Sequence, residues 1–160
     1  YWRDNFLGIS PLKDNNFHTK TYLSMCKDFC KKVYAKEEDK KDQALFLNKS
    51  VEYFEQNDNF DLEEFTETVI EKPEYAQQFK AHKNKYEETR GITTDEDFMI
   101  SKSALKTMKR KMKSLIKLDT NIEINIKPNE GEATGEAFIE KGFDEERKMN
   151  FYKVYFNTEK

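Results

Sequence analysis

The chain has 160 residues, a length that suits one domain, and its 13 Phe, 8 Tyr and one Trp supply apolar area for a core. Charged residues make up 37% of the chain, and the net charge is only −3. No apolar run approaches the roughly 18 residues that would span a bilayer, and no secretory signal is visible. We therefore expect a cytoplasmic protein without a membrane partner. Because the first residue is Tyr1 and not Met, we also expect an N-terminal part to be missing.

The first two thirds of the chain has the apolar spacing of helices. After an irregular entry segment over 1–17, large apolar side chains recur at intervals of three and four residues, which is typical of helices with one buried face. Pro73 suits the first turn of a helix, and Gly91 suits the residue that ends one. We predict helices over parts of 19–34, 43–56, 61–70 and 73–90. The charge cluster at 35–43 is either a loop or the first turns of the second helix.

The third helix carries the clearest start signal. Asp61 can cap it, and Glu64 follows three residues later, as in a capping box. Phe60 precedes the cap and Phe65 stands at the fourth helical position, so these two rings can form a hydrophobic staple.

After residue 92 the pattern changes from helical to mostly extended. Residues 98–100 are a possible short strand, 122–126 alternate strictly between apolar and polar, and 151–156 form a second strong strand. A turn at 119–121 predicts a hairpin, and Pro128, Gly131 and Gly135 mark a loop over 127–137. Helices followed by antiparallel strands predict an α+β fold, with N-terminal helices packed on a small, mostly antiparallel C-terminal sheet. We expect a single domain over 1–160, helical over about 1–95 and α/β over about 96–160.

Cysteine and histidine are too sparse for an obvious catalytic or metal site. Cys26 and Cys30 lie four apart on one helical face, and we interpret them as core residues that bind no metal and form no disulfide. His82 falls in an apolar stripe and is interpreted as a packing residue, whereas His18 is interpreted as a helix-start residue. Phosphate-loop, dinucleotide-binding, nucleophile-elbow and zinc-protease motifs are missing, so we expect no enzyme.

Positive charge is concentrated in one short segment. Residues 101–118 carry seven basic and no acidic side chains, whereas 1–100 sum to −6 and 119–160 sum to −4. Segregation of this kind says more about partners than the net charge does. The pattern is typical of a surface that meets a polyanion.

A helical wheel separates this segment into two faces. The basic face holds Lys102, Lys106, Lys109, Arg110, Lys113 and Lys117, and another face holds Ala104, Leu105, Met108, Met112, Leu115 and Ile116. We expect Ser101 to cap a helix that runs to about Met112. If 113–118 is a strand instead, Lys113 and Lys117 still share a face. Such a segment can anchor to a core and present cations to phosphates, although an ordinary amphipathic surface helix is the alternative. An anionic membrane is less favoured, since the apolar face has no Trp or Phe.

Ordered blocks along most of the chain resemble the C-terminal half of the bacterial nucleoid-associated protein family, NdpA type. The blocks are 1–7, 21–23, 26–29, 47–54, 60–61, 64–65, 115–119, 142–144 and 152–156. The resemblance implies a DNA-binding protein of the nucleoid, with no enzymatic activity and no cofactor, whose members are about twice this length. The chain departs from the family pattern at 127–137, where it has an enlarged loop.

Two functions remain open. The first is a DNA-backbone binder that uses Lys102, Lys106, Lys109, Arg110, Lys113 and Lys117 with little sequence preference. The second is a protein-interaction or dimerisation module, which docks DNA-processing proteins or a second copy while the DNA site lies in the missing N-terminal half.

Overall fold

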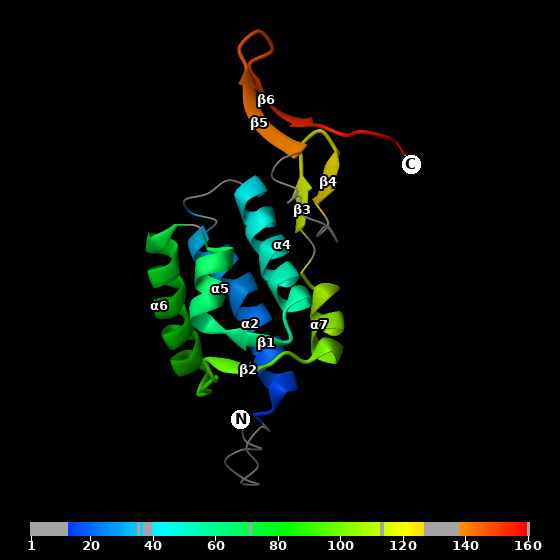
Figure 1. Cartoon of the computed structure of the whole chain (residues 1–160). Helices are drawn as coiled ribbons and strands as arrows, with labels where there is room; N and C mark the ends of the chain where they lie inside the picture. The colour runs from blue at the N-terminus through cyan, green and yellow to red at the C-terminus, as the bar shows by residue number, and fades with distance from the viewer. Residues whose placement is uncertain are drawn as a thin grey trace.

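The computed structural model describes residues 13–34, 36, 40–70, 72–112, 114–126 and 138–159. The elements run in the order α2 (Asn15–Phe29), η1 (Cys30–Tyr34, a π-helix), α4 (Lys40–Gln56), β1 (Asn59–Asp61), α5 (Leu62–Val69), α6 (Pro73–Arg90), β2 (Asp97–Met99), α7 (Lys102–Lys109), β3 (Ser114–Lys117), β4 (Glu123–Ile126), β5 (Ile139–Asp144) and β6 (Met149–Val154). The predicted α+β class is confirmed, and so are the four predicted helices (Figure 1).

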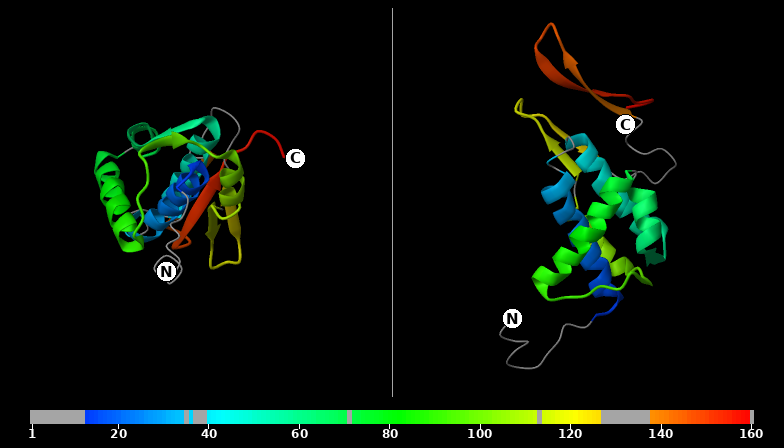
Figure 2. Two further views of the ribbon diagram at one scale, coloured as in Figure 1. Left: turned by 90° about the horizontal axis from the view of Figure 1, so that it is seen from below. Right: turned by 90° about the vertical axis from the view of Figure 1, so that its left-hand side faces the viewer.

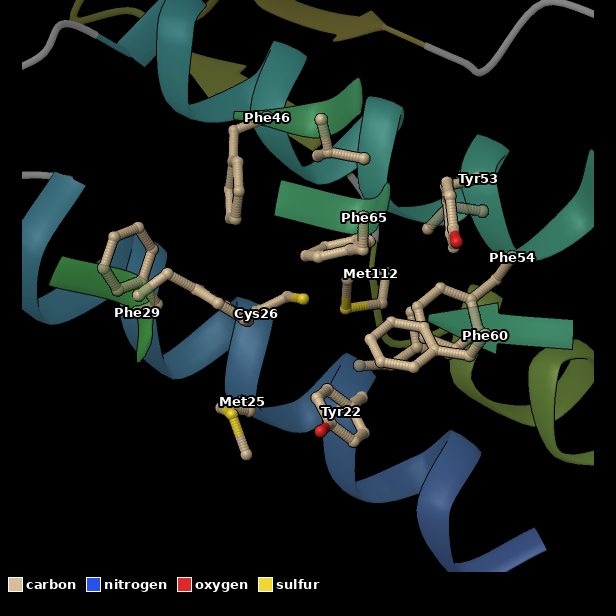
Figure 3. Packing of buried hydrophobic residues seen from close by; sticks show 14 of the residues in the cluster. Tyr22, Met25, Cys26, Phe29, Phe46, Tyr53, Phe54, Phe60, Phe65 and Met112 are labelled. Atoms are coloured by element: carbon tan, nitrogen blue, oxygen red, sulfur yellow. The ribbon is translucent and has the colours of Figure 1, made fainter. Parts of the chain in front are cut away.

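The helices enclose a core rich in aromatic rings. Tyr22 and Phe29 from α2, Phe54 from α4, Phe65 from α5 and Phe79 from α6 are all fully buried. Several of their rings meet directly in the interior; the centroids of Phe54 and Phe65, both labelled in Figure 3, lie 6.1 Å apart. Burial of large aromatic side chains is the main stabilising contribution in a domain of this size.

The local signals in the sequence set the helix ends as expected. The Asp61 carboxylate accepts a hydrogen bond from the Glu64 amide at 2.9 Å, and the rings of Phe60 and Phe65 lie 5.4 Å apart as a staple. The Glu64 carboxylate accepts from the Tyr53 hydroxyl at 2.9 Å, which ties α4 to α5. Gly91 ends α6 with a φ of 62°, in the left-handed region that glycine adopts without strain.

The described strands form three separate two-stranded antiparallel sheets instead of one sheet. β1 pairs with β2 across the base of the helices, where Phe60 stands opposite Phe98. β3 and β4 form the hairpin predicted around 119–121, with Asn121 in the left-handed region at a φ of 61°. The amide of Asn48 on α4 donates to the carbonyl of Ile126 at 3.0 Å and so holds this hairpin against α4.

The last hairpin, β5–β6, extends beyond the helices in Figure 1 and in the right panel of Figure 2. The predicted strand at 151–156 is confirmed, although it begins earlier and ends at Val154. The entry segment at 1–12 and the loop at 127–137 lie outside the described residues. Among the residues that are described, no helix is both long and apolar enough to cross a membrane.

Candidate nucleic-acid interface

Helix α7 presents the first part of the basic segment. Its N-cap is Ser101, whose hydroxyl accepts from the Ala104 amide at 3.3 Å. Ala104, Leu105 and Met108 are buried, so the opposite side of the helix faces solvent. The predicted cap and the predicted apolar face are both confirmed.

The helix ends at Lys109, earlier than the expected Met112, and the extent of that prediction was wrong. The chain turns at residues 110–111 and continues as β3, because 114–117 pair with β4. Met112 is nevertheless buried at 3% exposure, since the turn leads the chain back over the core. The helical wheel over 102–117 therefore applies only up to Lys109. For 114–117 the alternative prediction, a strand, is the one that the structure has.

Lys102 is engaged with the C-terminal end of α4. Its ammonium donates to the carbonyls of Asn57 at 2.7 Å, Glu55 at 3.3 Å and Phe54 at 3.4 Å. It also lies 3.5 Å from the carboxylate of Asp58. A cation at this position satisfies carbonyls that have no partner within the helix and complements the helix dipole. Lys102 is thus a structural contact between α7 and α4.

Two other predicted cations pair with acidic side chains. The Lys109 ammonium forms an ion pair with Glu55 of α4, and the Lys117 ammonium lies 3.4 Å from Glu123 on the facing strand. Both lysines are exposed, so these pairs contribute little to stability. They do reduce the positive potential that each lysine presents.

Lys106 and Arg110 are the predicted cations that stay open to solvent. Both are exposed, and neither side chain has a hydrogen-bond or ion-pair partner within the described part of the chain. Lys111 is also exposed beside them, although its carbonyl accepts from Lys27 at 2.7 Å. Lys113 lies outside the described residues. The structure therefore brings together a smaller basic surface than the sequence predicts, and we define the α7 surface as Lys106, Arg110 and Lys111.

A second concentration of positive charge, which sequence reasoning missed, lies between α6 and η1. A groove of about 680 Å³ is lined there by Lys31, Lys32, Lys36, Lys85 and Arg90. The cations come from segments some 50 residues apart and are diluted by acids in the sequence. A count of charges along the chain could not identify this groove. The one signal in the sequence was that Lys85 and Arg90 stand beside the apolar stripe of the helix over 73–90.

The cysteines are both buried, as expected. Cys26 is inaccessible and Cys30 is 4% exposed. Burial raises the pKa of the Cys26 thiol to about 12 and that of Cys30 to about 11. The Cys30 thiol donates weakly to the Gln43 carbonyl at 3.7 Å. These are properties of inert core thiols and not of nucleophiles.

The two histidines differ from each other in how well the sequence predicted them. His82 packs between Phe29 and Tyr86 as expected, and burial lowers its pKa. His18 lies in the first turn of α2, as a helix-start residue does, but it is 2% exposed and packs on Phe98, so the sequence did not predict its burial. Within the described residues, no group of three or more potential metal ligands occurs.

The comparisons with known proteins give one match. A family model described as nucleoid-associated protein YejK matches residues 1–150. No curated protein and no solved structure matches the chain. Because the match covers nearly the whole sequence, the resemblance seen in its ordered blocks is confirmed, and the chain belongs to the nucleoid-associated protein family.

Proposed function

We propose that this protein is a non-enzymatic DNA-binding protein of the bacterial nucleoid that contacts the phosphate backbone through its basic segment at 102–117. Membership of the nucleoid-associated family is the observation that carries the proposal. Within the segment, exposed Lys106 and Arg110 support a phosphate-binding role, because no described acid neutralises them.

The physical basis is electrostatic. A lysine or arginine that contacts a phosphate releases condensed counterions, so binding is tight at low salt, weak at high salt and nearly independent of sequence. Acidic residues outnumber basic ones in the rest of the chain, so DNA is favoured at the basic parts of the surface, of which this segment is one. Lys102, Lys109 and Lys117 would have to exchange a protein partner for a phosphate, so Lys106 and Arg110 are expected to contribute most.

A salt series with duplex DNA tests the proposal. The double variant Lys106→Gln/Arg110→Gln removes two exposed cations that have no described partner, and it should fold normally. The slope of log affinity against log salt is negative, and each lost phosphate contact reduces its magnitude by about 0.9. The double variant should therefore reduce the magnitude by about 1.8. The matched control is Lys20→Gln/Lys40→Gln, which removes two positive charges from exposed positions on α2 and α4.

The comparison of the two variants decides the outcome. We expect the control to bind duplex DNA with the slope of the parent, and the Lys106→Gln/Arg110→Gln variant to bind more weakly on every DNA sequence tried. Equal binding by parent and both variants would move the site elsewhere on the protein.

The second candidate function, a protein-interaction or dimerisation module, is favoured by the β5–β6 hairpin. Phe143 and Val154 are 50% and 56% exposed on one face, and Met149 and Phe151 are 52% and 40% exposed on the other. Residues opposite each other in an antiparallel pair share a face, and the register assigns these side chains accordingly. Neither strand has a second described neighbour, and a lone hairpin is only marginally stable in water.

Measurement of mass in solution separates this candidate from the first. A Phe143→Ser/Val154→Ser variant should shift an assembly toward monomer while leaving the salt slope on DNA unchanged. If the DNA slope changes and the mass does not, the hairpin belongs to the DNA interface instead.

A further inference from the structure

The groove between α6 and η1 has the dimensions and lining of a small-ligand site. Its volume of about 680 Å³ falls within the range of about 300–1,000 Å³ that such sites occupy. One wall is a single face of α6, because its lining residues recur at intervals of three and four, among them Ala81, Lys85 and Thr89. The opposite wall comes from η1 and Lys36.

Two lysines of that opposite wall belong to the π-helix. Residues 30–34 form a π-helical turn at the end of α2, and Lys31 and Lys32 are its second and third residues. Lys31 and Lys32 are exposed and line the groove beside Val33. Short π-helical insertions of this kind are frequent at functional sites.

The groove is strongly positive. Its described lining has five cations and no acid. Asp28, just outside, contacts two of the lining residues, lying 3.0 Å from the Lys32 ammonium and 3.2 Å from Nε2 of His82. One carboxylate does not balance five cations, so the groove attracts an anion. Lys31, Lys36 and Lys85 have no side-chain partner among the residues that the structure describes.

A planar group lies at one end of the groove. The Arg90 guanidinium lies 3.6 Å from the centroid of the Tyr86 ring, and both residues line the groove. Tyr86 is buried and Arg90 is exposed. A guanidinium held over an aromatic ring offers its outer face to a nucleic-acid base, which can stack on it.

We propose that this groove binds a nucleotide, with its phosphate held by Lys31, Lys32, Lys36 and Lys85 and its base stacked on the Arg90–Tyr86 pair. The apolar wall residues Val33 and Ala81 suit a base. The nucleotide can be free or the end of a single strand, and both present the same chemistry. This site is distinct from the α7 surface and does not rest on the proposed DNA-backbone function.

Titrations of the 160-residue chain with four probes test the assignment: adenosine monophosphate, inorganic phosphate, adenosine and a short single-stranded oligothymidylate. Amide chemical shifts report where each probe binds. We expect the monophosphate to perturb α6 and η1 and to bind at least about 5-fold more tightly than phosphate or adenosine alone. Tighter binding of the oligonucleotide at the same residues identifies a strand as the natural source, and tighter binding of the monophosphate identifies a free nucleotide.

Matched variants locate the site. Lys85→Gln and Lys31→Gln each remove one exposed ammonium from the groove and should weaken monophosphate binding about 5-fold. Lys20→Gln, which removes an exposed ammonium from α2 outside the groove, should bind as the parent does. Arg90→Gln should reduce the preference for the monophosphate over phosphate, because it removes the stacking platform. The Lys106→Gln/Arg110→Gln variant should keep full nucleotide binding, which separates this site from the DNA surface.

Three results would overturn the proposal. One is that the amide chemical shifts of α6 and η1 stay unchanged both with the monophosphate and with the oligonucleotide at millimolar concentration. Another is equal affinity for monophosphate and inorganic phosphate, which would leave the base without a role. The last is equal weakening by Lys85→Gln and Lys20→Gln, which would mean that only the net charge of the protein matters.

Discussion

The ring of Phe151 on β6 covers the backbone of Gly142 on β5. The two residues are direct partners in the antiparallel register. A Cβ added at Gly142 would lie 2.8 Å from Cε1 of this ring, closer than real Cβ atoms approach a neighbour. An aromatic ring over a glycine protects a weak point of a strand, and this contact is part of what holds the two-stranded hairpin together.

We therefore predict that Gly142→Ala loosens the hairpin without unfolding the helices. The ring is 40% exposed and can swing outward, so the loss is expected to be about 1 kcal/mol, felt locally. Hydrogen exchange should show faster amide exchange in β5 and β6, with exchange in α2 and α4 unchanged.

A second background provides the control. In a Phe151→Leu protein, Gly142→Ala should have a smaller effect, since the obstructing ring is gone. The same acceleration of exchange in both backgrounds would show that the ring contact does not constrain Gly142.

The capping of α5 gives a second prediction. Asp61 accepts from the Glu64 amide at 2.9 Å, so Asp61→Ala leaves a helix N-terminus without its cap and should lower the free energy of unfolding by about 1 kcal/mol. Asp61→Asn keeps an acceptor oxygen and should lose less. Urea unfolding of the two variants measures the difference, and equal midpoints would contradict the capping role.

The accuracy of the sequence predictions depends on how local each signal is. The cap at Asp61, the proline at the start of α6 and the terminator Gly91 act within a few residues, and the structure has all three as expected. By contrast, Lys83 is 5% exposed and pairs with Glu87 at 3.2 Å, although a lysine in a charged helix is normally solvated. Its burial depends on the packing of the whole helix and has no signature in the sequence.

In the candidate site, too, the local features could be predicted from the sequence and the long-range contacts could not. The excess of positive charge at 101–118 was visible, and so was the buried face of α7. The sequence could not show that Glu55, some 50 residues earlier, pairs with Lys109, or that the α4 terminus binds Lys102. Contacts between distant segments determine which basic side chains lack a described partner. The groove between α6 and η1 is likewise formed by segments that are distant in the sequence.

The cysteines give a prediction about reactivity and pH. Burial raises the thiol pKa from its ordinary value of 9.0 to about 12 for Cys26 and about 11 for Cys30. At pH 8 both should react with an aromatic disulfide reagent far more slowly in the folded protein than in guanidinium chloride. Rapid reaction of either thiol in the native state would contradict this expectation.

The sign of the stability effect follows from the same shifts. A raised folded-state pKa favours the protonated thiol in the folded protein, so its contribution is complete below about pH 9 and is lost as the pH rises from 9 towards 11 and 12. Unfolding midpoints should therefore fall more steeply above pH 9 in the parent than in a Cys26→Ala/Cys30→Ala variant.

The contrast between Lys102 and Lys106 gives the last prediction. Both are exposed lysines on one side of α7, but only Lys102 donates to carbonyls at the end of α4, at 2.7 Å for Asn57. Lys102→Gln should lower the free energy of unfolding by about 0.5–1 kcal/mol, a modest value because half of this side chain is in water. Lys106→Gln should change it by less than about 0.5 kcal/mol.

On DNA the order of the two variants should be reversed: Lys106→Gln, which affects stability less, should affect DNA binding more. Lys106→Gln removes a cation that has no partner among the described residues, and it should reduce the magnitude of the salt slope by about 0.9. Lys102→Gln should lower it less, because in the parent a phosphate has to compete with the α4 carbonyls for that ammonium. Thermal unfolding and a salt series on the same two proteins give both readouts. If Lys102→Gln leaves stability unchanged and lowers the slope as much as Lys106→Gln does, then Lys102 is a free phosphate contact and not a link between α7 and α4.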